Sequence, residues 1–255
     1  MRLSASSRSV AALAWSRILG LPDHSLHAGV MGESAEFTTK PSRSAATRAT
    51  HLQLVQASAL IAPQWFIDAC DNAPASELAE PRLLVDMARH YGYRDARILS
   101  EEAIYFLDEV PHYDHPNIEH SDSVVISLSR TDAQLVEQAS PADDYLSSQP
   151  SARDFQFTAV SEDDAAAWAT GAYDIWEGLV ADLAVLVRPE FRQSGFGKFV
   201  TGVSAEDALA EGLVPQFRVS MGNTAAMILA ESLGFVLSGS VTSVYLGEPS
   251  TTTPR

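Results

Sequence analysis

The sequence predicts an α/β protein with a buried core, and three observations support this expectation. The apolar run over residues 183–187 is typical of a buried strand. It leads into a segment with helical spacing, where Phe196, Phe199, Val200 and Val203 fall at i, i+3, i+4 and i+7. The chain has 255 residues, of which 46% are hydrophobic and 20% charged, as in ordinary globular proteins of one or two domains.

Strand and helix patterns alternate through the second half of the chain. In chain order we expect a strand over 123–128, a helix over 131–138 capped by Thr131, and strands over 155–160 and 165–176 around a turn at 161–164. The strand and helix just described come next. They are followed by a strand over 213–220, a helix after Asn223, and a closing strand or pair of strands over 236–246. Gly212 is expected to end the helix that follows residue 196.

The first half of the chain has weaker patterns. We expect a helix that contains Trp15, Ile18 and Leu19 and stops near residues 21–22, a strand over 52–55, helices that start at Pro63 and Pro81, and a short strand over 104–107. These segments hold enough apolar residues for a core of their own or for docking against the second half.

Residues 192–198, Arg-Gln-Ser-Gly-Phe-Gly-Lys, connect the strand at 183–187 to the helix that follows, and we call them the glycine loop. The N-terminus of a helix has unpaired backbone N–H groups and roughly half a positive charge, so it attracts anions. Gly195 and Gly197 permit a positive φ and a close approach of the backbone to a ligand. The pattern therefore predicts a phosphate or pyrophosphate site.

Two other phosphate-binding motifs do not fit these residues. A P-loop ends in Gly-Lys-Ser/Thr, whereas Phe199 follows Gly197 and Lys198 here. A dinucleotide-binding fingerprint requires a third glycine, and Val200 occupies that position.

A second block follows about 30 residues after the glycine loop. Asn223 is a good helix cap, and Gly234 suits the left-handed residue that ends a helix. The apolar face between them consists of Ala226, Met227, Ala230 and Leu233.

These two blocks resemble motifs of the GNAT superfamily of acetyl-CoA-dependent N-acetyltransferases. Residues 192–197 are similar to its R/Q-x-x-G-x-G/A loop, and residues 223–235 to its N-x-x-A…L-G-F block. The resemblance implies a mixed, mostly antiparallel sheet flanked by helices over residues 121–247. It also implies a smaller, divergent α/β module over residues 1–120 ahead of this domain, and we expect a disordered tail over 248–255.

The resemblance implies that acetyl-CoA is the cosubstrate. In the family, the motif strand and the next strand separate, and the pantetheine arm lies between them. Main-chain groups of the motif strand bind the arm, and amides of the loop bind the pyrophosphate. Carried onto this sequence, the cofactor-binding residues are Val185, Leu186, Val187, Arg192, Gln193, Ser194, Gly195, Phe196, Gly197, Lys198 and Asn223.

The proton chemistry departs from the family pattern. Many relatives place a tyrosine seven residues after the motif asparagine, as the acid that protonates the departing thiolate, but here that residue is Ala230. A thiol with a pKa of about 8.5 leaves tolerably as the thiolate, so the loss need not prevent transfer. Asp182, at the start of the motif strand, is the candidate base; the alternative is a solvent-facing carboxylate at the strand end.

The formal net charge of −16 argues against nonspecific binding to nucleic acid. Coenzyme A is itself anionic, so Arg188, Arg192 and Lys198 are expected to supply local positive potential, or else to form a solvated basic edge. If several acidic residues face the acceptor, they favour a cationic amine, from a small molecule or a protein. The acidic residues considered are Asp143, Asp144, Glu162, Asp163, Asp164, Asp174 and Asp182.

Other features indicate structure rather than chemistry. The His-containing segment 111–120 matches no metal-site spacing, and its prolines indicate a linker, so no metal is expected. Cys70 fits the apolar pattern of the Pro63 helix and is expected in the core. No run is long enough to span a membrane, and the basic N-terminus is better explained by a core helix than by a targeting peptide, so a cytoplasmic location is expected.

Two functions remain open from the sequence. The first is an active acetyl-CoA-dependent N-acetyltransferase. The second is a non-catalytic regulatory module that binds acyl-CoA. The presence of Ala230 at the position of the family's tyrosine supports this second function. The role of residues 1–120, in substrate binding, in formation of a homodimer or in covering a sheet edge, is also left open.

Overall fold

The structure is a computed structural model that describes residues 3–42, 47–71, 73–110, 124–162 and 166–248. The chain forms two compact units. The first contains Tyr105–Arg218 and Thr224–Val236, together with the N-terminal residues up to Ser7. The second contains Arg8–Ile104, Val219–Asn223 and the chain from Leu237 onward.

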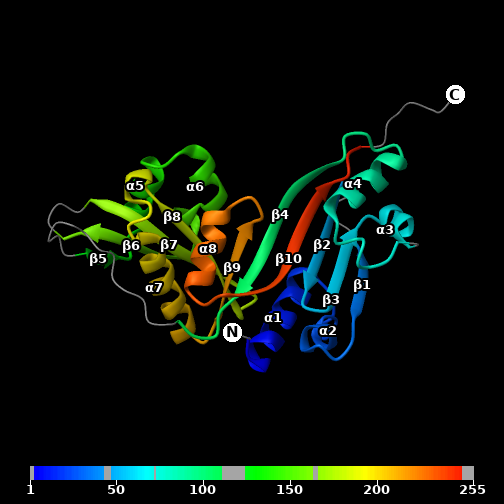
Figure 1. The fold of residues 1–255 in the computed structure, drawn as a ribbon, viewed down its shortest axis with the longest axis horizontal. Coiled ribbons are helices and arrows are strands. Elements are labelled where there is room, and N and C mark those ends of the chain that lie inside the picture. Colours follow the sequence, from blue (N-terminus) through cyan, green and yellow to red (C-terminus); the bar gives the residue numbers. More distant parts are fainter. Residues whose placement is uncertain (1–2, 43–46, 72, 111–123, 163–165, 249–255) are drawn as a thin grey trace. The chain divides into compact units, whose positions relative to one another are not determined.

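The first unit holds most of the elements expected in the second half of the chain (Figure 1). They are β5 (Val124–Ser127), α5 (Arg130–Gln138), α6 (Ala142–Ser148), the 3-10 turn η1 (Pro150–Ala152), β6 (Phe155–Ser161), β7 (Ala167–Trp176), β8 (Val180–Val187), the 3-10 turn η2 (Pro189–Phe191), α7 (Phe196–Ala210), β9 (Val214–Ser220) and α8 (Thr224–Ser232). One cap was predicted wrongly. Ser129, not Thr131, caps α5, and its hydroxyl accepts a hydrogen bond from the Thr131 N–H.

The strands of this unit follow the order β5-β6-β7-β8-β9. Neighbours from β5 to β8 are antiparallel, and β8 and β9 are parallel. Antiparallel pairs also predominate in the second unit, so the expected mixed, mostly antiparallel sheet with flanking helices is confirmed.

Successive side chains of β8 point to opposite faces of the sheet, as the pleat of a strand requires. Val185 and Val187 pack with Phe196 and Phe199 of α7. Leu186 instead packs in a cluster with residues of α5 and α6. Figure 1 shows α7 on one side of this sheet and α5 and α6 on the other. Even-numbered residues of β8 therefore belong to the α5/α6 face.

A glycine in β7 lets α7 lie close to the sheet. A Cβ added at Gly171 would be 2.4 Å from the Val200 carbonyl oxygen and 2.4 Å from the Ser204 Oγ. Both atoms belong to α7, so no larger residue fits at this position without displacing the helix. Since α7 starts at the glycine loop, this contact also positions the loop.

The strands of the second unit follow the order β1-β3-β2-β10-β4. Its elements are α1 (Ala5–Ile18), α2 (His27–Met31), β1 (Glu36–Pro41), β2 (Arg48–Leu54), β3 (Ala57–Ala62), α3 (Gln64–Cys70), α4 (Pro81–His90), β4 (Arg97–Phe106) and β10 (Val236–Tyr245). The helices predicted at Pro63 and Pro81 are confirmed, with Pro63 as the cap of α3 and Pro81 as the first residue of α4. No helix in the described part of the chain is long and apolar enough to cross a bilayer.

Helices α3 and α4 pack on the strands of this unit through one apolar cluster. Cys70 lies in that cluster, which confirms its expected place in the core, and burial raises the pKa of its thiol to about 11. The strand expected to close the catalytic segment, β10, pairs with β2 in register from Gly239↔Leu54 to Tyr245↔Arg48. The predicted boundary at residue 120, the linker at 111–120 and residues 249–255 of the tail lie outside the described residues.

Candidate functional site

The glycine loop contains two residues with left-handed backbone conformation. Gln193 has φ 64° and Gly195 has φ 87°. Gly195 is the N-cap of α7, and η2 separates it from the end of β8. A left-handed backbone is strained for residues with a Cβ and is free of this strain at glycine, which explains the residue type at position 195.

The loop presents a run of main-chain donors at the start of a 15-residue helix. The first N–H of α7 that bonds to a backbone carbonyl is that of Phe199, which donates to Gly195 at 3.0 Å. Within the described residues, the N–H groups of residues 193–198 have no backbone acceptor. Residues 193–195 are exposed. Six consecutive amides and the positive end of the helix dipole therefore form a surface that is electrostatically suited to an anion.

The basic residues near the loop are partly compensated by acidic neighbours. Arg192 donates to the Asp144 carboxylate of α6 at 2.6 Å and to the Val187 carbonyl at 3.3 Å. Arg188 binds Glu190 and the Ala167 carbonyl. A backbone hydrogen bond and the Arg188 guanidinium hold the pKa of Glu190 below its usual value. Arg188 and Arg192 thus have carboxylate partners, whereas none is seen in the described residues for Lys198 or for the main-chain amides of the loop.

Strands β8 and β9 separate beside the loop. Their register runs from Val180↔Val214 to Leu183↔Phe217 and stops there. Strand β8 continues to Val187, paired with β7 only, and β9 continues to Ser220. We call this opening, lined by residues 184–187 of β8, the fork. Val185, Leu186 and Val187, the expected arm-binding residues, therefore lie in the fork, and the glycine loop follows it in the chain.

The second sequence block lies at the start of α8. Asn223 directly precedes the helix, is exposed, and donates its backbone N–H to the Ser220 carbonyl at 2.8 Å. Gly234 has φ 82°, as predicted for the residue that ends the helix. Ala230, at the position of the family's tyrosine, is completely buried. It has no side-chain atom that exchanges a proton.

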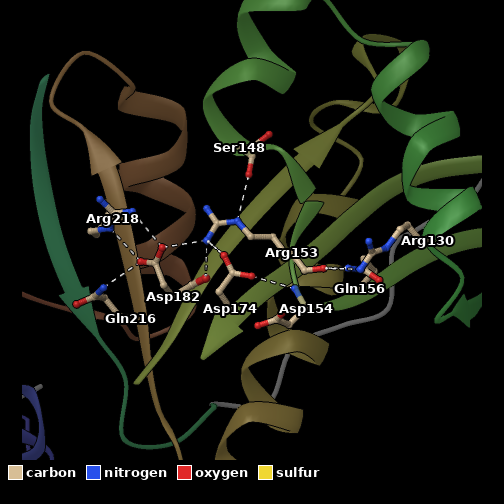
Figure 2. Close-up of polar contacts among 9 residues, drawn as sticks. All are labelled: Arg130, Ser148, Arg153, Asp154, Gln156, Asp174, Asp182, Gln216 and Arg218. Atoms are coloured by element: carbon tan, nitrogen blue, oxygen red, sulfur yellow. Dashed lines mark hydrogen bonds and ion pairs between the residues drawn. The ribbon is translucent and has the colours of Figure 1, made fainter. Parts of the chain in front are cut away.

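Asp182 is not a solvent-facing carboxylate, because its exposed fraction is 1%. Its Oδ1 accepts hydrogen bonds from Gln216 Nε2 at 2.9 Å and Arg218 Nε at 3.0 Å. Its Oδ2 accepts from Arg218 Nη2 and Arg153 Nη1, both at 3.0 Å. Figure 2 shows these four contacts converging on the carboxylate.

The four donors account for the acceptor capacity of Asp182. A carboxylate offers about two lone-pair directions on each oxygen, and each oxygen here has two donors. An ammonium group or a water would have to displace an arginine or Gln216 to reach it. This arrangement suits a structural ion cluster better than a general base, so we assign Asp182 a different role below.

The partners of Asp182 were not among the site residues expected from the sequence. Arg153 lies between η1 and β6, and also binds Asp174 of β7 at 3.0 Å. Arg218 and Gln216 come from β9. Each contact joins residues far apart in the chain, so no local spacing indicates it. The available signal was an aspartate within the otherwise apolar β8 segment, since a buried charge requires partners.

Among the residues that the structure describes, no group of three His, Cys, Asp or Glu side chains is arranged to hold a metal ion.

Comparison with protein families identifies the region that contains the glycine loop and the fork. Residues 124–235 match the model of the acetyltransferase (GNAT) family. The chain contains a GNAT acetyltransferase domain. The match includes β5 to β9, the glycine loop and α8, so the resemblance inferred from the two sequence blocks is confirmed.

Several solved structures are similar to the chain at low identity. A putative GNAT-family acetyltransferase from Novosphingobium aromaticivorans is 20% identical with a TM-score of 0.43, over 59% of this chain and 67% of the other. A GNAT-family acetyltransferase from Colwellia psychrerythraea is 16% identical with a TM-score of 0.44, over 58% of this chain and 57% of the other. A GCN5-related N-acetyltransferase from Kribbella flavida is 17% identical with a TM-score of 0.43, over 66% of this chain and 65% of the other.

The last two similarities span less than two thirds of those proteins. The assignment of residues 124–235 to the GNAT family rests on the family model. No curated protein matches the chain.

Proposed function

We propose that the protein is an acetyl-CoA-dependent N-acetyltransferase that transfers an acetyl group to a primary amine by direct attack on the thioester. The observation that carries this proposal is the run of six main-chain amides at the start of α7, which follows the fork between β8 and β9 after the 3-10 turn η2. One region thus offers donors for a pyrophosphate and an open strand edge for an extended arm.

Main-chain groups perform most of the binding in this proposal. The amides of Gln193, Ser194, Gly195, Phe196, Gly197 and Lys198 bind the pyrophosphate, with Arg192 at the rim of the loop. Backbone groups of Val185, Leu186 and Val187 bind the pantetheine amides along the edge of β8. One N–H in the fork donates to the thioester oxygen and stabilises the negative charge that develops there during transfer. Asn223 caps α8 and contacts the arm.

The transfer itself needs a neutral amine next to the thioester carbonyl. The amine nitrogen forms a bond to the carbonyl carbon, the carbon–sulfur bond breaks, and the coenzyme A thiolate leaves. The ammonium form of the amine first loses one proton to water, and the nitrogen loses a second proton to water after it has bonded to the carbonyl carbon, which leaves the neutral amide. Because Ala230 has no acidic group, the thiolate takes its proton from solvent, which is feasible for a thiol with a pKa of about 8.5.

The acceptor is a small-molecule or protein amine, and the structure weakens the argument for a cationic one. Asp144, Asp174 and Asp182 each form an ion pair with an arginine, so their charge is compensated within the protein. Asp163 and Asp164 lie outside the described residues. Only part of the acidic set therefore remains to attract a cation. Residues 121–247 as the catalytic segment, a cytoplasmic location and a reaction without a metal ion remain parts of the proposal.

The alternative is a non-catalytic, regulatory acyl-CoA-binding module, and the buried Ala230 favours it. The two functions share the binding site and differ only in turnover. Acetyl-CoA binding measured by calorimetry, combined with thiol release in the presence of polyamines, aminoglycosides and lysine peptides, distinguishes them. Thiol release that depends on an amine, with an acetylated product, supports the enzyme. Tight binding without transfer to any amine supports the module, and absence of binding contradicts both.

A further inference from the structure

We propose that Asp182 is a positioning residue for acetyl transfer: its ion cluster fixes the point at which β9 leaves β8 and so sets the opening that receives the acyl arm. This inference rests on the proposed function, because it assigns a role to the fork as the site of the arm. It replaces the role of base that the sequence suggested for the same residue.

The location of Asp182 is the first argument. In the β8–β9 register, Asp182 pairs with Gln216, and the next pair, Leu183 with Phe217, is the last. Arg218 is thus the first residue of β9 beyond the pairing, and its guanidinium binds the Asp182 carboxylate through both Nε and Nη2. A two-point contact of this kind restrains direction as well as distance. The first residue of β9 beyond its register with β8 is therefore still held to β8 by this side-chain contact.

The cluster also ties the fork to the rest of the sheet. Arg153 bridges the carboxylates of Asp182 in β8 and Asp174 in β7, both at 3.0 Å (Figure 2). The backbone N–H of Asp154 donates to Asp174 at 2.9 Å, and the Arg218 guanidinium lies 4.6 Å from the centre of the Trp176 ring. Side chains of β7, β8 and β9 are thus joined at one level of the sheet, where the fork begins.

The energetics favour a geometric role over simple stabilisation. A buried ion cluster loses much of its Coulomb energy to desolvation, so its net contribution to stability is small, whereas its hydrogen-bond directions are strict. Removal of the carboxylate would remove the counter-charge that the Arg153 and Arg218 guanidiniums share, and Asp174 would still bind Arg153. The expected consequence is a shift of Arg218 and of the β9 backbone that it anchors.

The cluster lies on the face of the sheet opposite α7. Asp182 is even-numbered like Leu186, and Leu186 packs with residues of α5 and α6. The glycine loop and α7 hold the nucleotide end of the ligand, so an arm that enters the fork from that side reaches the level of Asp182 with its acyl end. The cluster is therefore placed to orient the reacting end of the arm and is remote from the pyrophosphate.

The experiment compares Asp182→Asn with the matched control Asp174→Asn. Both substitutions remove one negative charge from the same cluster, but only the first exchanges an acceptor oxygen that contacts β9 for an amide donor. Affinities are measured for acetyl-CoA and for 3′-phospho-ADP, the part of coenzyme A without the arm. We expect Asp182→Asn to weaken acetyl-CoA binding and to lower kcat, each by about tenfold to a hundredfold, and to change 3′-phospho-ADP affinity by less than about twofold.

The control Asp174→Asn is expected to change the acetyl-CoA affinity, the 3′-phospho-ADP affinity and kcat by less than about threefold each. A merely structural role of Asp182 would reduce the affinities for acetyl-CoA and for 3′-phospho-ADP in parallel, through loss of folded protein. Equal effects of the two substitutions on acetyl-CoA binding and on kcat would overturn the proposal.

A milder variant covers the case in which Asp182→Asn does not fold. Gln216→Met removes one donor from Asp182 Oδ1 and keeps the side-chain length. It is expected to weaken acetyl-CoA binding about threefold to tenfold without affecting 3′-phospho-ADP. If the parent protein binds neither ligand, the proposed function fails. Amide hydrogen exchange then still tests whether the cluster fixes β9. Faster exchange at residues 214–217 in Gln216→Met, with unchanged exchange in β6 and β7, supports that role of the cluster. Unchanged exchange at residues 214–217 refutes that role.

Discussion

Gly195 is the single residue on which the geometry of the glycine loop depends most directly. Substitution by glutamate places a side chain at φ 87° and a negative charge among the amides assigned to the pyrophosphate. We expect Gly195→Glu to reduce acetyl-CoA affinity more than a hundredfold, with about 1–2 kcal/mol lost in the free energy of unfolding from backbone strain. Isothermal calorimetry measures the affinity, and denaturant unfolding measures the stability.

Gly212→Glu is the matched control for this variant. Gly212 also has a left-handed backbone, with φ 78°, follows the C-terminal end of the same helix, and has space for a side chain. It should lose similar stability and keep its affinity for acetyl-CoA. Retained affinity in folded Gly195→Glu would place the cofactor elsewhere.

His51 is expected to make the stability of the protein depend on pH. It is buried in β2, and burial lowers its pKa to about 4, against about 6.5 in an unfolded chain. Between these two pKa values the unfolded state therefore binds more protons than the folded state does. The stability from neutral His51 is complete above pH 6.5 and is lost as the pH falls toward 4, by about 3 kcal/mol in total.

Urea unfolding at pH 7 and pH 4.5 measures this change in the free energy of unfolding. In His51→Leu the part of the pH dependence that belongs to this residue should disappear. The same fall in stability in the variant would show that other groups cause it.

At the scale of residues, the sequence predicted the glycines with left-handed backbone and missed the side-chain cluster around Asp182. Gly195 and Gly234 were predictable because left-handed positions restrict the residue type within a few positions along the chain. The partners of Asp182 lie 29 to 36 residues away, and the register of three strands decides that they meet. A local pattern contains no information about that register.

Among the elements, α7 depends on a glycine in the strand beneath it. We expect Gly171→Ala to destabilise the protein by about 2–3 kcal/mol, because its Cβ would overlap the Val200 carbonyl and the Ser204 hydroxyl of α7. Acetyl-CoA affinity should fall as well, since α7 holds the glycine loop. Thermal and urea unfolding, together with calorimetry, measure both effects.

Gly178→Ala, in the turn between β7 and β8, is the corresponding control. A Cβ there meets no atom within 4 Å, although φ is 69°. Gly178→Ala should lower the free energy of unfolding by about 1 kcal/mol and leave acetyl-CoA binding unchanged. Equal losses of stability and of acetyl-CoA affinity in the two variants would contradict the close approach of α7 at Gly171.

Elements with a clear apolar period were predicted, and elements without one were missed. Helices α3, α4, α7 and α8 and strands β6 to β9 follow their patterns closely. Helix α6 was missed because none of its residues is buried, so it shows no apolar face. Strand β1 has a lysine and a proline at its end, and it exists because it pairs with β3, which the sequence alone does not reveal.

For the whole molecule, the sequence indicated the GNAT region but not the partner of the last strand. The pattern at 236–246 predicted a strand, and the structure pairs that strand with β2, about 190 residues earlier in the chain. Such a pairing depends on the complete topology rather than on local propensity. The family model ends at residue 235, before this strand, so the comparison leaves the pairing to the structure alone.

The most direct measurement is a crystal structure of the complex with acetyl-CoA. We expect the pyrophosphate oxygens to accept hydrogen bonds from the amides of residues 193–198, the arm to lie along residues 185–187 in the fork, and the acetyl group to reach the level of Asp182. A complex with the glycine loop empty and the nucleotide bound to another surface would contradict the account.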